Sequence, residues 1–465
     1  MPMPWIRVDG DQLVDDSGRP VLLRGFGLGG WMNMENFISG YPGTESQTRA
    51  AMRSTLGAEG YARFFDTFLR DFFDEDDAQM LSSLGVNCLR VPFNYRHFED
   101  DDAPFVLRED GFRLLDRVID ICARHGIYTI LDLHAAPGGQ NHHWHSDNPT
   151  HHAFFWVHRH FQDRVVYLWE ALAERYRDNP AVAGYNPLNE PADESGEVIG
   201  PFYTRLEQAI RAVDPRHVLF LDGNKYSSDF SVFDEPVSNA VYTAHDYALP
   251  GIARTSEYPG TTRGEYFDRG VVEQTFLRRT EYMRRTGTPI WVGEFGPIYT
   301  GDPVRDASCY QLLRDQLSIY AAHGASWSLW TYKDVGRQGL AYLPADSQYL
   351  RQISPSLEQK LRLGTDSWGG SDAHVRHIMQ PIEDLFAQEF PDFQPYPWGQ
   401  RQWIPLLVRN IMLAEPAAER FGQCFEGVSP QRAEELASSF ALSSCVVRAE
   451  LADVLRDHLN AVPSS

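Results

Sequence analysis

The chain has 465 residues, of which 43% are hydrophobic and 13% aromatic, and its formal net charge is −22. This length and composition are typical of a globular protein with a large core and exclude a disordered chain. The negative charge argues against nucleic acids and anionic membranes as partners, and no run of about 18 apolar residues indicates a membrane span.

The chain begins with MPMPWIRVDG, which lacks the basic and apolar regions of a signal peptide, so we expect a cytoplasmic protein. The cysteines fit this expectation. The five cysteines are widely scattered and form no CxxC pair, a pattern that favours free thiols in a reducing compartment over a disulfide framework.

The first predicted element is a hairpin, because alternating segments flank turn signals at Asp9-Gly10 and Ser17-Gly18. Strand-like apolar runs then alternate with amphipathic helical patterns such as 74–85 and 111–126. The eight strand-like runs are 21–30, 85–94, 128–137, 182–191, 217–225, 241–248, 289–297 and 326–334.

Eight short apolar strands, each followed by a helical pattern, predict a (β/α)8 TIM barrel. The rival is a doubly wound open sheet, which is disfavoured because no glycine-rich phosphate loop follows the first strand. We expect residues 1–344 to form the barrel with its hairpin, including a long insertion at 32–76. Residues 345–465 are expected to form an extension packed on the barrel, with helices near 375–390, 401–420 and 429–460.

Polar or aromatic side chains stand at the ends of six of the predicted strands, where a TIM barrel carries its reactive groups. Each has a structural explanation when taken alone: a salt bridge, a satisfied core histidine or a buried tryptophan. The set as a whole is harder to explain in that way. It comprises Arg90, His134, Asn189, Glu190, His245, Tyr247, Glu294 and Trp330.

Two glutamates, Glu190 and Glu294, would face one another across such a barrel. Paired carboxylates without a metal are what glycoside hydrolysis needs, one as nucleophile and one as acid. Arg90 could lower the pKa of the nucleophile, and the asparagine beside the acid could bind the sugar 2-hydroxyl. Trp330 offers a flat face for a sugar ring.

In this set of residues the sequence resembles glycoside hydrolase family 5, over residues 20–335. The resemblance implies a retaining barrel glycosidase in which Glu190 is the acid/base and Glu294 the nucleophile. It also implies that His245 and Tyr247 orient the two glutamates and that His134 lines the site. For a retaining enzyme we expect the two carboxyls to lie about 5–5.5 Å apart.

A finer resemblance concerns LRGFGLGGWMNMENFI and LDLHAAPGGQN, which are similar to segments of exo-β-1,3-glucanases. It implies that Glu35, and Asp147 or Asn148 in SDNP, bind the terminal sugar. Glu35 capping the first turn of the insertion is the alternative. Gly27 stands where that branch has asparagine, so the identity of the sugar stays open.

The loop at 141–152 is rich in histidine, and its H-x-H spacing raises the question of a metal site. Sugar contacts at the rim or plain surface are favoured, because no cysteine or carboxylate at ligand spacing completes a site and the two-glutamate chemistry needs no metal. We expect neither a metal nor a cofactor. The histidines are His142, His143, His145, His151 and His152.

The sequence therefore predicts an exo-acting retaining β-glycosidase for short oligosaccharides or small β-glycosides. An endo-glucanase or mannanase, a transglycosylase and a non-catalytic sugar-binding barrel are the alternatives, the last disfavoured because both glutamates are present. We expect the insertion and the histidine-rich loop to close one end of the cleft into a blind pocket. The glycone, linkage, aglycone and oligomeric state are left open.

Overall fold

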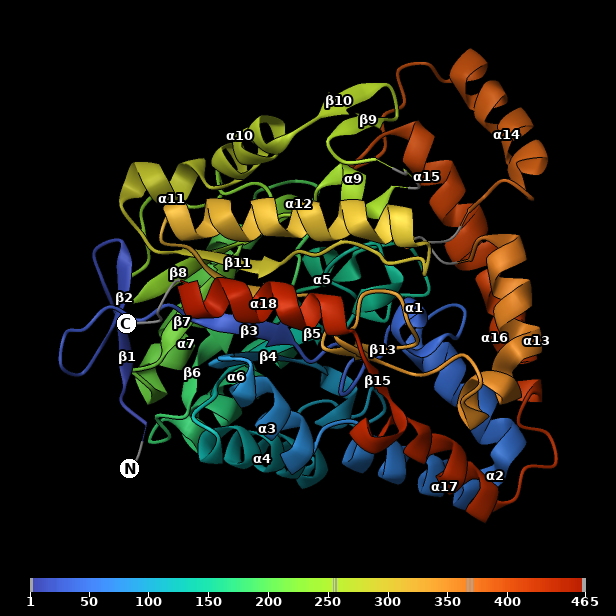
Figure 1. Cartoon of the computed structure of the whole chain (residues 1–465), viewed down its shortest axis with the longest axis horizontal. Coiled ribbons are helices and arrows are strands. Elements are labelled where there is room, and N and C mark those ends of the chain that lie inside the picture. Colours follow the sequence, from blue (N-terminus) through green and yellow to red (C-terminus); the bar gives the residue numbers. More distant parts are fainter. Residues whose placement is uncertain (1–2, 254, 256, 366–367, 369–370, 462–465) are drawn as a thin grey trace.

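The computed structural model describes residues 3–253, 255, 257–365, 368 and 371–461. At its centre is a closed barrel of eight parallel strands (Figure 1). The predicted TIM barrel is therefore confirmed and the open sheet excluded. In chain order the strands are β3 (Arg24–Gly27), β4 (Cys88–Asn94), β5 (Tyr128–Ala135), β6 (Val182–Asn186), β7 (Val218–Asp222), β8 (Ala240–His245), β11 (Ile290–Glu294) and β12 (Ser326–Leu329).

Every residue of these eight strands is buried, as expected for parallel strands with side chains inside the barrel on one face and helices on the other. The barrel closes where Trp327 of β12 pairs with Arg24 of β3. Large apolar side chains such as Ile130, Phe220 and Trp291 belong to one cluster of the core. The barrel is thus a packed core, and space for a ligand arises only beyond the strand ends.

Helices surround the barrel (Figure 1), and some of them begin at clear capping signals. The Asp74 side chain caps α3 in a reciprocal capping box with Asp77, and Asp302 caps α12 ahead of a proline at its first turn. The helices are α3 (Glu75–Ser83), α4 (Glu109–Arg124), α6 (Arg159–Tyr176), α7 (Ile199–Val213), α10 (Arg269–Arg279), α11 (Glu281–Thr286) and α12 (Pro303–Ala322).

The shorter elements lie mostly in the loops between these helices and the strands. They are α5 (Phe154–Val157), α8 (Asn224–Ser227), α9 (Leu249–Ile252), the 3-10 turns at Tyr95–His97 and Trp144–Ser146, and the hairpin of β9 (Gly260–Thr262) with β10 (Glu265–Phe267). A separate small sheet joins β13 (Lys333–Asp334), β14 (Ala341–Tyr342) and β15 (Val446–Val447).

The predicted N-terminal hairpin and the insertion after the first barrel strand are both present. The hairpin consists of β1 (Ile6–Asp9) and β2 (Gln12–Asp15). The insertion holds α1 (Asn36–Ser39) and the long α2 (Glu45–Asp71), which begins at a Thr44 capping box and is interrupted at Gly57.

The C-terminal extension is helical, as predicted, but its helices divide differently. An additional helix, α13 (Gln348–Leu363), precedes the predicted ones and has Pro355 in its interior, which is why its pattern does not read as a helix. The stretch predicted near 429–460 is broken by short turns and β15. The other helices are α14 (Arg376–Glu389), α15 (Gln400–Leu407), α16 (Ala414–Gln423), α17 (Pro430–Ala437) and α18 (Ala449–Ala461), with a π turn at Val408–Met412 and 3-10 turns at Ser438–Phe440 and Leu442–Ser444.

The extension packs on both the insertion and the barrel. Figure 1 shows α2 beside α16 and α17, and α18 lies along α12. A buried lysine joins these parts, because Lys333 Nζ lies 2.8 Å from an Asp77 carboxylate oxygen and donates to the carbonyls of Phe72 (2.7 Å) and Phe440 (2.9 Å). The Lys333 ammonium group therefore connects the segment at 72–77 to the C-terminal extension at Phe440.

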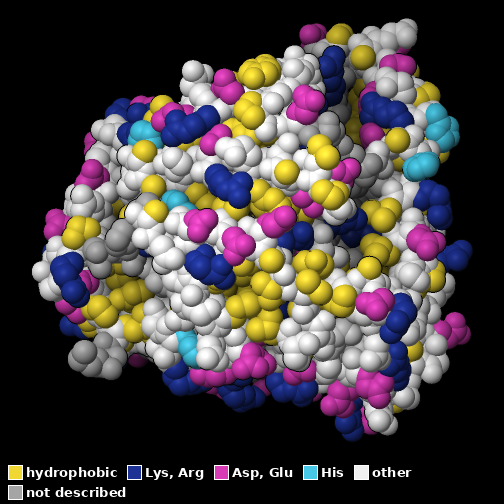
Figure 2. All heavy atoms as spheres, in the orientation of Figure 1, with side chains coloured by type: hydrophobic (Ala, Val, Ile, Leu, Met, Phe, Trp, Pro, Cys, Tyr) yellow, Lys and Arg dark blue, Asp and Glu magenta, His cyan; other side chains and the backbone are white. Residues whose placement is uncertain are grey.

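The surface mixes both signs of charge despite the net charge of −22. Figure 2 shows acidic and basic side chains interspersed on the face in view, notably along its lower edge. Within the described part of the chain, no helix is both long enough and apolar enough to cross a membrane.

Candidate active site

A cavity of about 380 Å³ opens beyond the C-terminal ends of the barrel strands. It brings together seven of the predicted site residues with other side chains from the histidine-rich loop and the C-terminal extension. Its lining consists of Glu35, His134, His143, Trp144, His145, Glu190, Lys225, Tyr226, Ser228, His245, Tyr247, Ile252, Arg263, Arg279, Glu294, Trp330, Trp368, Trp398, Gln402 and Leu406.

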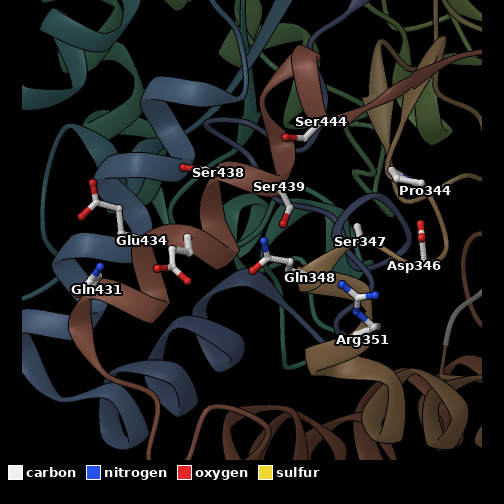
Figure 3. Close-up of a pocket in the computed structure, with 11 residues that line it drawn as sticks. Pro344, Asp346, Ser347, Gln348, Arg351, Gln431, Glu434, Ser438, Ser439 and Ser444 are labelled. Carbon is white, nitrogen blue, oxygen red and sulfur yellow. The ribbon is translucent and has the colours of Figure 1, made fainter.

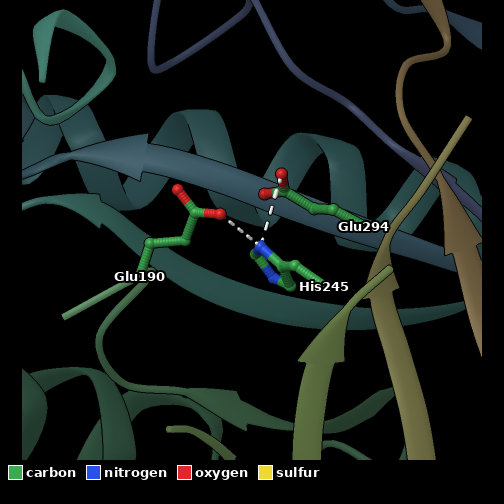
Figure 4. A group of neighbouring side chains, drawn as sticks. All are labelled: Glu190, His245 and Glu294. Carbon is green, nitrogen blue, oxygen red and sulfur yellow. Dashed lines mark hydrogen bonds and ion pairs between the residues drawn. The ribbon is translucent and has the colours of Figure 1, made fainter. Parts of the chain in front are cut away.

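Glu190 and Glu294 face each other across a single imidazole (Figure 4). His245 Nδ1 lies 2.7 Å from Glu190 Oε1 and 3.5 Å from Glu294 Oε2. One oxygen of each glutamate and one histidine nitrogen all lie within 4.8 Å of one another. The two carboxylates are therefore close enough to act on the same bond of a ligand.

Glu294, the last residue of β11, is held through both of its oxygens. Arg90 Nη1 donates to Oε1 at 2.7 Å, and the Tyr247 hydroxyl donates to Oε2 at 3.0 Å. Burial, with the nearby carboxylates, raises the pKa of Tyr247 well above its ordinary value, so that hydroxyl keeps its proton and stays a donor. The Glu294 carboxylate is thus fixed in orientation while one edge faces the cavity.

Arg90 lies fully buried in β4 and ties the site together. Besides Glu294 it contacts Asn189 Oδ1 (2.6 Å), Asn186 Oδ1 (2.9 Å) and Asp132 Oδ2 (3.1 Å). Burial would lower the pKa of Arg90, but the surrounding carboxylates raise it above its ordinary value. A permanent cation therefore lies beneath the paired glutamates.

Glu190 departs from the expected strand end and lies in a strained loop. Strand β6 ends at Asn186, and Glu190 has φ +45°, a left-handed conformation that is uncommon for residues other than glycine. Its N–H donates to Asp222 Oδ2 at 2.9 Å, and its carbonyl accepts from Asn141 Nδ2 at 3.0 Å. These bonds hold the strained backbone and aim the carboxyl at the cavity.

The protonation of Glu190 is governed by two imidazoles. Burial raises the pKa of this carboxyl, but hydrogen bonds and charges from His145 and His245 outweigh burial and hold it well below its ordinary value. Burial alone would lower the pKa of His245, but the charges of Glu294 and Glu190 outweigh burial, so the pKa of His245 lies above its ordinary value. These opposite shifts favour a protonated His245 that donates to an ionised Glu190 across the 2.7 Å hydrogen bond.

His145 belongs to the histidine-rich loop and was not among the predicted site residues. Its Nε2 lies 3.2 Å from Glu190 Oε2 and 2.9 Å from Asn141 Nδ2. The sequence identifies it only as one of five histidines in the loop at 141–152, for which sugar contacts at the rim or plain surface are expected. Among the described residues, the sole group of three or more side chains with metal-ligand spacing is Glu190, His245 and Glu294, and none of the loop histidines belongs to such a group.

A metal ion bound to those three side chains would compete with contacts already in place. Arg90 and Tyr247 each donate to Glu294, and His245 is hydrogen-bonded to Glu190. The fixed charge of Arg90 also opposes a second cation nearby. The donor set fits paired carboxylate chemistry better than a metal centre.

His134 lies in β5 and joins the core of the site to the insertion. Its Nδ1 lies 2.7 Å from Asp132 Oδ2, and its Nε2 lies 3.3 Å from Glu35 Oε1. Burial lowers the pKa of His134, but Asp132 and Glu35 raise it to about 10. The cationic ring stacks on Trp330, with centroids 5.3 Å apart and planes 5° from parallel.

Glu35 lies at the start of α1 but its side chain does not cap that helix. It is 3% exposed and lines the cavity, where Oε1 has the 3.3 Å contact to His134 but no hydrogen bond of good geometry. Burial raises the pKa of Glu35, and His134 opposes that rise. An acceptor with spare capacity thus faces the space a sugar would occupy.

Asp147 and Asn148 are placed differently from the expectation, because neither lines the cavity. Asp147 accepts from Ser46 N (2.8 Å) and Asn94 Nδ2 (3.1 Å), and Asn148 Nδ2 donates to the carbonyl of Asn141 at 2.7 Å. Their polar atoms hold the histidine-rich loop in place. His145 and Trp144 of the same loop line the cavity instead.

Asn189 is fully buried, next to Arg90 and His134. Its Oδ1 accepts from Arg90, and its Nδ2 lies 3.2 Å from His134 Nε2.

The cavity walls are rich in aromatic rings that the sequence analysis did not predict as part of the site. Trp368 packs on Tyr247 with centroids 4.7 Å apart, and Trp398 lies 37% exposed. Both tryptophans come from the C-terminal extension.

A second hollow, of about 630 Å³, lies within the C-terminal extension between the start of α13 and α17 (Figure 3). Its lining is made mostly of serine, glutamine and acidic side chains, with Arg351 on one side. It contains no histidine or tryptophan and shares no residue with the barrel cavity. The barrel cavity is therefore the candidate active site.

Comparison with known proteins agrees with this geometry. A family model described as cellulase, glycosyl hydrolase family 5, matches residues 51–336. A beta-xylosidase of Phanerodontia chrysosporium is 46% identical over 476 aligned residues that cover 99% of each chain. A probable glucan 1,3-beta-glucosidase A of Aspergillus fumigatus is 27% identical over 49% of this chain and 56% of that one.

The fold also matches a solved structure. An endogalactoceramidase superposes with a TM-score of 0.52 at 21% identity, over 71% of this chain and 75% of the other. At that identity the match bears on the fold alone, and it agrees with the closed eight-stranded barrel.

Proposed function

This chain belongs to glycosyl hydrolase family 5 and is a glycoside hydrolase, and on that premise we propose that it is a retaining exo-β-glycosidase that releases terminal xylose. The observation that carries the mechanism is the Glu190–His245–Glu294 arrangement. One oxygen of each glutamate lies within 4.8 Å of the other, and such a close pair favours the roughly 5–5.5 Å carboxyl separation of retaining enzymes over the 6.5–9.5 Å of inverting ones.

In the first step Glu294 attacks the anomeric carbon while Glu190 protonates the leaving oxygen. The carbon–oxygen bond to the aglycone breaks, and an ester between the sugar and Glu294 forms. Arg90 and Tyr247 orient the attacking carboxylate through its two oxygens. Their hydrogen bonds must adjust as the negative charge of Glu294 is consumed in the ester.

The acid role requires that a proton reach Glu190 at the right moment. We assign this to His245, which holds the shared proton 2.7 Å away and can return it as the leaving oxygen becomes basic. In the second step Glu190 takes a proton from water, the water oxygen attacks the anomeric carbon, and the ester to Glu294 breaks. The free sugar leaves with its original configuration.

Exo action is supported by what surrounds the glutamates. Glu35 of the insertion, and Trp144 and His145 of the histidine-rich loop, line the cavity beside His134 and Trp330. We propose that they enclose the terminal sugar, with Glu35 accepting from one of its hydroxyls. A buried hydroxyl without a partner would cost about 1–3 kcal/mol. Asn189 does not line the cavity, because its amide is fully buried and bonded to Arg90 and His134, so its contact with the 2-hydroxyl stays a prediction.

Xylose is proposed as the glycone because the full-length relative at 46% identity is named a beta-xylosidase. The test is a panel of 4-nitrophenyl β-glycosides of xylose, glucose, mannose and galactose, followed by proton NMR of the first product released from xylobiose. We expect the xyloside to be the best substrate and β-xylose to appear first. Preference for another glycone would overturn the xylose proposal, and α-xylose as first product would overturn retention.

An intracellular location is also part of the proposal. Its support is that all five cysteines are free thiols, with Cys88, Cys122 and Cys309 buried. Burial raises the pKa of each of these three thiols, which keeps them protonated and unreactive. Fractionation of the native host with an antibody to the protein tests it, and recovery from the culture medium would contradict it.

A further inference from the structure

The strand that follows the acid's strand ends in an unusual left-handed turn. In α8, which follows β7, the three consecutive residues Lys225, Tyr226 and Ser227 have φ of 54°, 58° and 57°. Each such residue costs an L-amino acid chain free energy relative to the right-handed form. Strain of this kind persists where the surroundings impose it, and it is common at ligand sites.

The turn is fixed to the loop that carries the acid. Asn224 and Asp193 exchange two hydrogen bonds, from Asp193 N to Asn224 Oδ1 (2.8 Å) and from Asn224 Nδ2 to the Asp193 carbonyl (2.9 Å). Tyr226 N donates to the carbonyl of Pro191 at 3.1 Å. The strained turn therefore keeps a set position relative to Glu190, and its side chains Lys225 and Tyr226 line the cavity.

Tyr226 forms an aromatic wall together with the C-terminal extension. Its ring lies 4.6 Å from that of Trp398 at 31°, and His143 lies 5.0 Å from Tyr226 and 5.1 Å from Trp398. Trp398 is 37% exposed and lines the cavity. An open aromatic face next to the acid suits a ring on the leaving-group side of the scissile bond.

The cavity also has three cationic side chains in its lining, although the chain as a whole is strongly acidic. Lys225 from the turn, Arg263 from the β9–β10 hairpin and Arg279 from α10 all line it. Arg279 has one distant partner, Asp246 at 3.8 Å. Among the residues that the structure describes, Lys225 and Arg263 are exposed and form no ion pair.

We propose that the part of the cavity lined by Lys225, Tyr226, Arg263 and Trp398 binds an aglycone that carries a carboxylate, namely a uronic acid. The Tyr226–Trp398 wall would lie under its ring, and Lys225 and Arg263 would pair with its charge. The proposal rests on the proposed function only in placing this ring on the leaving-group side. Neutral aglycones need no such cations, and cationic ones would be repelled by them.

The test is a calorimetric titration with two probes of nearly equal size, glucuronic acid and its neutral methyl ester. We expect the wild-type protein to bind the acid about 5–10-fold more tightly than the ester, the range that two exposed ion pairs supply. The preference should fall toward one at about 0.5 M salt, where exposed charges are screened.

Variants distinguish the contribution of the two cations to binding from the contribution of the aromatic ring contact. Lys225→Gln with Arg263→Gln should remove the preference for the acid, and each single change should remove part of it. Trp398→Ala should weaken both probes alike, because an aromatic face does not distinguish their charge. Arg285→Gln, an exposed arginine outside the cavity lining, is the matched control and should leave the preference unchanged.

A comparison of kcat/KM for two aryl xylosides tests whether the acidic site lies on the leaving-group side of the scissile bond. The 4-carboxyphenyl β-xyloside should have a higher kcat/KM than the 4-carboxamidophenyl β-xyloside, and the double variant should lose this difference. Equal binding of the two calorimetric probes by the wild type, or an unchanged preference in the double variant, would overturn the inference. A charge preference in calorimetry without cleavage of either xyloside would instead contradict the proposed function and leave the acidic site supported.

Discussion

His134 makes the stability of the protein sensitive to alkaline pH. Its pKa is raised from 6.5 to about 10 in the folded protein, chiefly by Asp132 against the effect of burial, and the ring is only 2% exposed. Because the folded pKa lies above the unfolded one, the stabilisation is fully present below pH 6.5 and is lost as pH rises through 10. A shift of this size corresponds to about 4–5 kcal/mol.

The assay is urea unfolding of the wild type and of His134→Gln, followed by circular dichroism between pH 6 and 10. We expect the wild type to be the more stable at pH 6 and the gap in unfolding free energy to narrow by about 4–5 kcal/mol by pH 10. Groups that have no contact with His134 titrate alike in both proteins and cancel in the difference.

His458→Gln is the matched control, since burial lowers the pKa of His458 to about 4 and it stays neutral throughout this range. Its gap to the wild type should change by only about 1 kcal/mol between pH 6 and 10, and in the opposite direction, because only the unfolded-state imidazole of His458 titrates in this range. If the gap for His134→Gln narrowed by no more than about 1 kcal/mol, the ion-paired histidine inferred beneath Trp330 would be wrong.

Three further substitutions test the site and the fold. Glu294→Ala should abolish turnover, and azide should restore it on a dinitrophenyl xyloside with an α-xylosyl azide as product; near-normal activity without azide would refute the nucleophile assignment. Glu190→Ala should slow substrates with poor leaving groups about 10²–10⁴-fold and dinitrophenyl substrates far less; equal losses would refute its acid role. Lys333→Met should lower the unfolding free energy by about 3–5 kcal/mol, because it leaves Asp77 buried without its partner. A loss below about 1 kcal/mol in denaturant titrations would contradict the view that the buried Lys333–Asp77 pair stabilises the fold.

The barrel could be predicted from the sequence because buried parallel strands have a simple pattern of short apolar runs. Most of the family's strand-end residues could be placed because they lie at or just after such a run, although Arg90 lies inside β4 and Glu190 lies in the loop beyond β6. Asp147 and Asn148 are residues whose role could not be predicted from their position in the sequence. They match a sugar-binding pair by position, but their polar atoms bond to the backbone and to the insertion, and only the three-dimensional path of the loop decides that.

The outer wall of the cavity could not be read from the sequence at all. Trp398 and Trp368 lie far along the chain from the barrel residues that they face, and their segment has no periodic pattern pointing to a site. Lys225 and Tyr226 reach the cavity through left-handed backbone that their side-chain types do not favour. Their positions follow from tertiary contacts rather than from local preference.

The most direct test of the two-glutamate mechanism is to trap the covalent intermediate. The enzyme is incubated with 2,4-dinitrophenyl 2-deoxy-2-fluoro-β-xyloside, digested and analysed by mass spectrometry. We predict one fluoroxylosyl group per chain, on the peptide that contains Glu294 and linked to that carboxyl. A label on Glu190, or turnover of ordinary xylosides with inversion and no label at all, would contradict the account.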